Sequence, residues 1–394
     1  MSSSSELIGL LIEEGEVFSP EPIGQTSIAA IAGRTVALGT SAAGLAACAG
    51  SIRRVNARGL RVIPGLIDQH IHFLGGGDAN GPLGRVAELH ARDLLAAGTT
   101  TAVGLLGVDN ETRDLRLLLR KTHELRQAGV SAFAYTGGMP LPARHLLDSV
   151  CADISFVDQF IGAKSAVAER LHPNRNWNDL ADLAGEVMRA RAMSGKAAPL
   201  HVHVGPLEEA ISPLMRLVSE LGMSANQIVP THVNRTTDFS PVFAQAIDFA
   251  RMGGTIDLTC CVSKIDGNLT GIDVPEAVQT CLDQGVPLDN ITMSTDGNIP
   301  ATIRDKDGNA LGYRTVPPGV LLRDVVRLVH EAGLGWEQAL RPATVNVARV
   351  LGLADRKGRI AQGFDADYVL LDENGAVRMV IAGGRVIFDH MEAS

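Results

Sequence analysis

The chain has 394 residues and a formal net charge of −9, with 45% hydrophobic and 20% charged residues. The acidic balance argues against a nucleic-acid binder, because phosphate binding needs a basic face. The composition is that of a globular protein with a full core. Because the length exceeds the usual size of a single core, we expect one large domain and a smaller one.

Cysteine usage and the chain start bear on the compartment. The five cysteines are odd in number and lack a Cys-x-x-Cys spacing, which is typical of reduced thiols. Residues 1–6 carry no basic segment, so no signal peptide is expected. The Ala- and Gly-rich segment 27–51 is interrupted by Arg34 and is too broken to span a membrane. These features predict a soluble, cytoplasmic protein without a membrane partner.

The two chain ends share a β-rich character. The segment up to Arg61 alternates short apolar runs with turn residues and shows no convincing helix, and the tail from Gly358 reads likewise. We expect residues 1–61 and 358–394 to pair into one small β-sandwich. Independent hairpin extensions are the alternative.

From about Leu60 onward, short apolar runs alternate with longer amphipathic stretches, a pattern typical of repeated βα units. Strands are predicted at 62–68, 99–105, 131–135, 160–164, 200–203, 227–232, 255–259 and 290–295. Helices are predicted at 85–97, 110–128, 176–193, 206–221, 240–252, 274–284, 320–332 and 336–351. Eight units predict an α/β fold, a (β/α)₈ barrel over residues 62–357, with catalytic groups at the C-terminal ends of its strands.

The first predicted barrel strand runs into Asp68-Gln69-His70-Ile71-His72. Alternate side chains of a strand face the same way, so His70 and His72 would present two imidazoles where the strand ends. Imidazole is a good ligand for zinc and similar divalent metals. A His-x-His pair alone is a weak signal, because polar residues are common at strand ends.

Further candidate ligands end other predicted strands: Lys164, His201, His203, His232 and Asp296. Each has an ordinary alternative, such as a surface histidine, a lysine that reaches solvent or an aspartate that opens a turn. Their joint placement on several strands predicts a metal site at the barrel mouth.

These segments resemble the amidohydrolase superfamily and, within it, the isoaspartyl dipeptidases. The resemblance is nearly full length and is carried by residues 64–72, 75–77, 103–107, 161–164, 230–235, 253–257, 340–344 and 363–367. The run Thr231-His232-Val233-Asn234-Arg235 is quite specific to that subfamily. The resemblance implies a binuclear metal-dependent hydrolase of a small-molecule amide, assembled as a homo-oligomer.

The resemblance also implies the cofactors, two divalent ions expected to be Zn²⁺. The implied ligands are His70, His72 and Asp296 for one ion, His203 and His232 for the other, and Lys164 as a bridging carbamate derived from CO₂. His201 shares a face with His203 and is a rival ligand. His203 is preferred because it stands nearer the end of its strand and matches the family position.

The implied chemistry is physically consistent. Burial lowers the pKa of a lysine and exposes the lone pair that CO₂ addition needs. A zinc-bound water ionises near neutral pH, and the metal-bound hydroxide would attack the substrate carbonyl. Asp296 would accept the proton of this nucleophile and deliver it to the leaving amine.

The expected substrate-binding residues are mostly replaced. A glutamate that holds the α-amino group of the substrate is Ala79 here, with Asp78 as the candidate replacement. An expected threonine is Val108, and an expected tyrosine is Met139.

Two further positions depart from the family pattern. An expected arginine is Leu171, with Arg170 displaced by one, and an expected serine is Pro300. Arg235 alone stands in register and could pair with a substrate carboxylate, the alternative being a structural ion pair. The candidate substrate contacts are Arg235, Gly77, Asp78, Met139 and Arg170.

In such a pocket the charged groups of a zwitterionic dipeptide would be buried without partners, which costs binding free energy. We therefore predict an amide-bond hydrolase with altered, less polar specificity, acting on an isoaspartyl or related N-acyl amino acid. One alternative is a hydrolase of cyclic amides, lactones or carbamates. Another is a scaffold paralogue, which would be expected to lose metal ligands, whereas this chain keeps all six.

Overall fold

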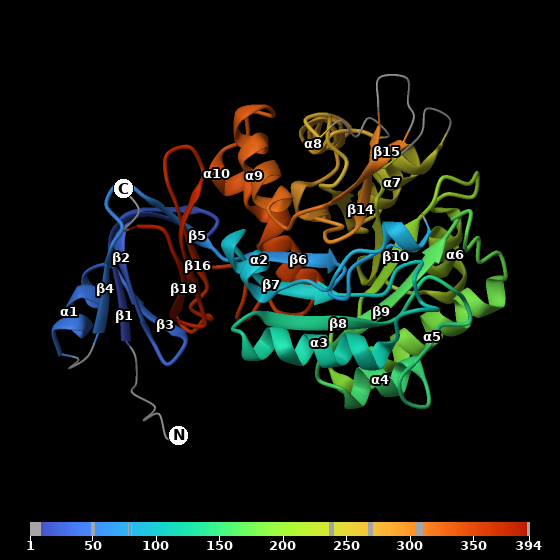
Figure 1. Ribbon diagram of the computed structural model, residues 1–394, viewed down its shortest axis with the longest axis horizontal. Helices are drawn as coiled ribbons and strands as arrows, with labels where there is room; N and C mark the ends of the chain where they lie inside the picture. Colours follow the sequence, from blue (N-terminus) through green and yellow to red (C-terminus); the bar gives the residue numbers. More distant parts are fainter. Residues whose placement is uncertain are drawn as a thin grey trace.

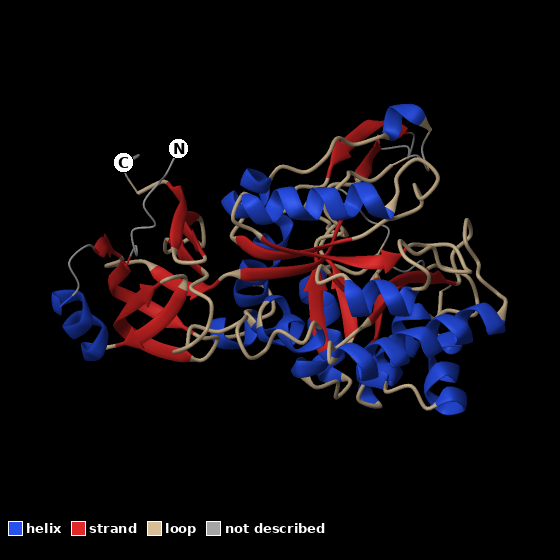
Figure 2. Cartoon of the chain, turned by 90° about the horizontal axis from the view of Figure 1, so that it is seen from below, coloured by secondary structure: helices blue, strands red, loops and turns tan. Residues whose placement is uncertain are grey.

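The computed structural model describes residues 9–48, 52–77, 79, 81–235, 240–266, 271–304 and 310–391. A smaller unit of strands stands beside a larger unit of strands and helices (Figure 1). Seen from below, helices surround the strands of the larger unit (Figure 2). Among the described residues, no helix combines the length and apolar character needed to cross a membrane.

The larger unit is built on eight parallel strands: β6 (Leu66–Ile71), β7 (Thr99–Gly104), β8 (Ser131–Gly137), β9 (Phe160–Val167), β10 (Leu200–Val204), β11 (Ile228–Thr231), β12 (Ile256–Thr259) and β13 (Ile291–Ser294). Each strand pairs with the next one in sequence. The chain beyond β13 returns to β6 through a parallel bridge between Gly297 and Ile71. All eight predicted strands are present, and the predicted barrel is confirmed.

The helices of this unit are α2 (Ala91–Ala96), α3 (Leu115–Gln127), α4 (Val150–Phe156), α5 (Trp177–Ser194), α6 (Ser212–Leu221), α7 (Val242–Arg251), α8 (Val274–Asp283), α9 (Val320–His330), α10 (Trp336–Ala339) and α11 (Val345–Val350). Local signals set several ends. The Asp114 side chain accepts a hydrogen bond from the backbone N–H of Leu117 and caps α3, and Gly195, with φ +72°, ends α5.

Four helix predictions were wrong in detail. Residues 85–90, 110–114 and 206–211 lie outside helices, and α4 was not predicted. The single helix predicted at 336–351 is broken by a 3₁₀ turn at Arg341–Ala343, where Pro342 cannot donate a helical hydrogen bond.

The smaller unit contains β1 (Gly9–Phe18), β2 (Pro22–Ile31), β3 (Arg34–Leu38), β4 (Ile52–Asn56), β5 (Arg61–Pro64), β16 (Tyr368–Leu371), β17 (Val377–Ala382) and β18 (Arg385–Asp389). Their order is β18-β17-β16-β5-β1-β2-β3, and β4 also pairs with β1. Both chain ends therefore form one β domain, as predicted. Leu10, Ile28, Tyr368 and Ile381 belong to its core. The helix α1 (Thr40–Cys48), absent from the prediction, contributes Ala42 to a second small cluster.

The predicted strand 62–68 is in fact two strands. β5 pairs with β16 in the smaller unit, and β6 pairs with β7 in the barrel. Gly65 lies between them, where an added Cβ would come within 2.1 Å of the Thr100 hydroxyl. The run looked continuous because both strands are buried. Domain boundaries at residues 61 and 358 stay a prediction.

Two further features complete the fold. A hairpin, β14 (Pro300–Arg304) and β15 (Ala310–Thr315), follows β13 and was not predicted. The four cysteines with described side chains, Cys151, Cys260, Cys261 and Cys281, are buried thiols.

Candidate metal centre

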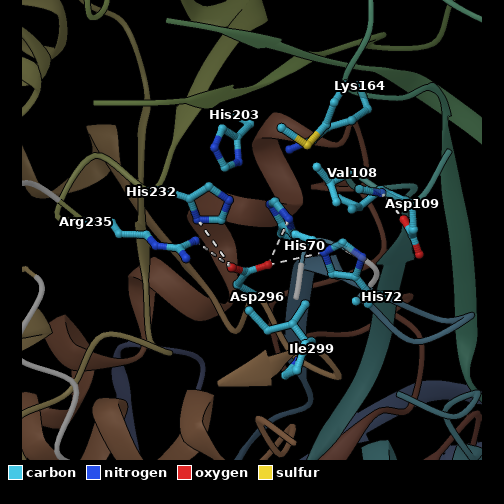
Figure 3. A pocket seen from close by; sticks show the side chains of 17 residues that line it. His70, His72, Val108, Asp109, Lys164, His203, His232, Arg235, Asp296 and Ile299 are labelled. Carbon is cyan, nitrogen blue, oxygen red and sulfur yellow. Dashed lines mark hydrogen bonds and ion pairs between the residues drawn. The ribbon is translucent and has the colours of Figure 1, made fainter. Parts of the chain in front are cut away.

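One pocket at the C-terminal ends of the barrel strands, of about 160 Å³, gathers the six predicted ligands. These are His70, His72, Lys164, His203, His232 and Asp296. They come from five strands and the turns that follow them, and their functional groups face one another (Figure 3). The barrel brings together residues that lie far apart in the chain, such as Asn298 and His72, which are 226 positions apart and hydrogen-bonded.

The Asp296 carboxylate lies at the centre of the pocket. Its Oδ1 is 3.4 Å from Nε2 of His70 and 3.3 Å from Nε2 of His72. Its Oδ2 is 3.9 Å from Nδ1 of His232 and 3.5 Å from the Arg235 guanidinium. The carboxylate therefore links the β6 end of the barrel to the β11 end.

The imidazoles form a continuous group around this carboxylate. The His232 ring lies 4.7 Å from the rings of both His70 and His203, measured between centroids. Burial is the main cause that holds the pKa values of His70 and His232 well below the usual value. Neutral imidazoles with free lone pairs are the form that binds metal.

Lys164 lines the pocket but is almost fully buried, and its Nζ has no hydrogen-bond partner among the described residues. Burial lowers the pKa of this lysine to about 7, against a smaller opposing effect of Asp296 and Asp257. The amine is therefore neutral in a substantial fraction of molecules near neutral pH.

Asp296 remains ionised despite its burial. Burial alone would raise the pKa of the carboxyl, but the interactions with His232, His70 and His72 outweigh it and hold the pKa well below the usual value. The carboxylate is available both as a ligand and as a proton acceptor.

Two of the ligands sit on unusual backbone. His232, directly after β11, has φ +64°, and Asp296, two residues after β13, has φ +48°. Non-glycine residues pay a cost in this left-handed region, and such residues are concentrated at functional sites. Asp68 supports the arrangement, because its Oδ1 accepts the backbone N–H groups of His70 (3.1 Å) and Thr295 (3.2 Å).

The residues present fit a divalent metal. His70, His72 and Asp296 bring one ligand atom each within 4.8 Å of one another. Nδ1 of His232 and Nζ of Lys164 are buried with no hydrogen-bond partner among the described residues, as expected of atoms whose partner is a metal or a modified group. A set of imidazole and carboxylate donors suits zinc and related ions.

The substrate side of the pocket matches the prediction only in part. Gly77, Met139 and Arg235 line the pocket, whereas Arg170 is exposed and lies outside the residues that line it. Asp78 lies outside the described residues.

The wall around these positions is mainly apolar. The replaced positions Ala79, Val108 and Pro300 all contribute to it, together with Leu105 and Ile299. The expectation that Leu171 also faces the substrate was wrong. Its side chain is 61% exposed and does not line the pocket.

Two acidic residues of the site were missed by the sequence analysis. Asp109 lines the pocket but is paired with Arg113 and accepts the backbone N–H of Gly107 at 3.1 Å. Glu169 accepts a hydrogen bond from Nε2 of His203 at 3.0 Å. Asp109 lies in the loop after β7, and Glu169 lies in the loop after β9. An acidic residue soon after a barrel strand was the only sequence signal that could have placed them at the site.

Known proteins share this architecture. The structure of a beta-aspartyl dipeptidase from Fervidobacterium islandicum AW-1, solved in complex with beta-Asp-Leu dipeptide, is 30% identical over 98% of both chains, with a TM-score of 0.87. The sequence model of the amidohydrolase family matches residues 266–387. The chain belongs to the amidohydrolase family. Its relatives there are metal-dependent hydrolases.

Curated relatives of this amidohydrolase are more distant. Adenine deaminase 2 of Rhizobium meliloti is 28% identical over 84% of this chain, which spans about half (49%) of that protein. An imidazolonepropionase of Streptomyces griseus is 25% identical over 84% of this chain and 82% of its own length. The structure of an enamidase, 18% identical with a TM-score of 0.68, shares the fold.

Proposed function

We propose that this amidohydrolase cleaves the amide bond of N-acyl amino acids whose acyl group is uncharged, in preference to β-aspartyl dipeptides. One observation carries the proposal: a complete set of predicted ligands shares its pocket with an apolar wall at the positions where an isoaspartyl dipeptidase would be expected to bind a zwitterion. The similarity to a beta-aspartyl dipeptidase supports the reaction class.

The proposed metal ligands divide into two groups. His70, His72 and Asp296 would hold one ion, and His203 and His232 would hold the other. Lys164 would contribute a carbamate ligand after its neutral amine has added CO₂, a step that forms an N–C bond and releases a proton. When bound, divalent ions such as Zn²⁺ supply a water activated near neutral pH and polarise the substrate carbonyl.

Asp296 would move the proton. It accepts the proton of the attacking water and delivers it to the nitrogen of the leaving amino acid. Its Oδ2 is 3.5 Å from the Arg235 guanidinium, so the carboxylate that would transfer the proton lies next to a cationic group.

Arg235 would orient the substrate. Its guanidinium side chain is 43% exposed, so it is accessible from the pocket mouth. A bidentate pair with the carboxylate of the amino-acid part would place the scissile bond beside Asp296.

The wall would select the acyl part. Val108, Met139 and Ile299 offer no partner to an ammonium group, and the nearby Asp109 is already paired with Arg113. Burying an unpaired ammonium costs several kcal/mol, on the order of 2–7 kcal/mol for polar groups generally. An uncharged acyl chain pays no such cost.

Three matched substrates test the proposal. N-succinyl-leucine is β-Asp-Leu without the ammonium group, and N-butyryl-leucine also replaces the distal carboxylate by a methyl group. We expect kcat/KM of the zinc-loaded protein to rise in the order β-Asp-Leu, N-succinyl-leucine, N-butyryl-leucine. A preference for β-Asp-Leu would contradict the proposed specificity, and turnover that survives chelation would contradict the metal centre.

A parallel panel of cyclic amides, lactones and carbamates separates the alternative hydrolase reactions, since they lack the carboxylate that Arg235 is proposed to hold. The homo-oligomeric state and the cytoplasmic location stay predictions of the sequence.

A further inference from the structure

His201 is a buried histidine that the proposed metal centre does not use. It precedes His203 by two residues on β10, so both side chains face the same side of the strand. His203 lines the pocket, but His201 is fully buried and does not. In the sheet, the Cα of His201 pairs with that of Lys164 on β9, two residues before the level of His203.

The closest polar contact of His201 is with a proposed ligand. Its Nε2 lies 2.9 Å from Nδ1 of His70, while Nε2 of His70 faces the Asp296 carboxylate at 3.4 Å. A hydrogen bond between these two nitrogens uses one proton, which either ring can carry. If His70 carries that proton on Nδ1, its Nε2 keeps a free lone pair on the side where the other ligands gather.

The Tyr135 ring fixes the orientation of the His201 ring. It stacks on Tyr135 with 5.1 Å between centroids and 13° between planes. This contact holds Nε2 toward His70 without using either nitrogen. The Nε2 of His201 is therefore held within hydrogen-bond distance of His70, and the tautomers decide which ring donates.

The neighbouring carboxylate does not turn this pair into a separate metal site. His70, His201 and Asp257 have ligand atoms within 4.8 Å of one another. However, the Asp257 oxygens already accept hydrogen bonds from a ring of four side chains, each at 2.6–2.8 Å: Gln69, Thr231, Thr292 and Ser294. A carboxylate with its lone pairs occupied in this way has none left for a cation.

We infer that His201 is a positioning residue: its Nε2 accepts the Nδ1 proton of His70 and holds His70 in the tautomer whose Nε2 is free to bind metal. The inference rests on the metal centre proposed above. Partners of this kind orient metal-binding histidines, and their loss lowers metal affinity by roughly 10–100-fold.

Two substitutions separate the hydrogen bond from packing. His201→Gln keeps an acceptor near the position of Nε2, whereas His201→Phe keeps the aromatic ring above Tyr135 but has no acceptor. Tyr135→Phe is the control for disturbance of this part of the core. Zinc equivalents and zinc affinity are measured for each full-length protein by competition with a chelator.

We expect His201→Phe to bind zinc roughly 10–100-fold more weakly than the unsubstituted protein. His201→Gln and Tyr135→Phe should stay within about threefold of it, and the number of equivalents should not change in either. Unchanged affinity in His201→Phe would overturn the inference. Loss of one zinc equivalent in His201→Gln would also overturn it, because His201 would then be a ligand.

A spectroscopic measurement addresses the hydrogen bond itself. In the zinc-loaded, unsubstituted protein with ¹⁵N-labelled histidine, a scalar coupling across the N–H···N bond should join Nδ1 of His70 to Nε2 of His201. A proton found on Nε2 of His201 would overturn the inference. None of these readouts uses turnover, so failure of the proposed amide hydrolysis would leave them intact, whereas failure to bind zinc at all would overturn both.

Discussion

The floor and the wall of the pocket differ in origin. The floor consists of the six proposed ligands at or just after the ends of barrel strands, and the wall consists largely of loop residues such as Val108, Met139 and Ile299. In a closed barrel, strand ends are fixed by hydrogen bonds to two neighbours, whereas loops are free to change length and composition. Substitutions in the wall can therefore change the substrate while the floor, and with it the reaction type, stays the same.

The largest expected effect is on the floor. Asp296→Asn removes the proposed proton acceptor and a ligand, so we expect kcat/KM to fall by about 10³-fold, within the range for loss of a general base. Steady-state kinetics with N-butyryl-leucine and metal analysis measure this. Asp289→Asn, at an exposed ion pair with Arg341, is the control. Activity within tenfold of the original would show that Asp296 is not the base.

The wall is tested by restoring expected residues. The double substitution Ala79→Glu and Met139→Tyr supplies an anion for the ammonium and a hydroxyl in the pocket. We expect the ratio of kcat/KM for β-Asp-Leu over N-butyryl-leucine to rise by roughly 10–100-fold, since a paired charge replaces an unpaired one. An unchanged ratio would mean that the wall does not set specificity.

A smaller effect concerns stability and pH. The pKa of Lys164 is about 7 in the folded protein against 10.5 ordinarily, because of burial. Between these values the unfolded chain binds a proton that the folded chain does not, so this group makes the metal-free protein more stable as pH rises. The contribution is up to about 1.4 kcal/mol per pH unit.

Urea unfolding of the metal-free protein between about pH 7 and pH 9 measures this slope. Lys164→Met should remove it, whereas Lys264→Met, at an exposed ion pair, should not. Equal slopes in both variants would contradict a neutral, buried Lys164.

The smallest effect is expected at the rim. Arg170 is exposed and outside the residues that line the pocket, so Arg170→Ala should change kcat/KM by less than about twofold. A loss of tenfold or more in kcat/KM would show that the loop after β9 contacts the substrate, and that Arg170 belongs to the wall.

Much of the floor could be predicted from the sequence, because its signals are local. A buried apolar run that ends in His70 and His72 predicts a strand and two side chains on one face, and the same logic applies to Lys164 and His232. The wall could be predicted only as a loss of expected residues. Neither periodicity nor composition showed that Leu171 turns away or that Asp109 is paired with Arg113.

The sequence by itself determined the order of the eight barrel strands and the residues at their ends, because periodicity and burial leave a local pattern. Only the tertiary structure decided which of the side chains on one face of a strand reach the pocket and which are buried in the barrel. It placed His203 in the pocket and His201 beneath it against His70. It also divided one apolar run between two sheets at Gly65. The alternation along a strand specifies a face, but only closure of the barrel specifies which level of that face meets the substrate.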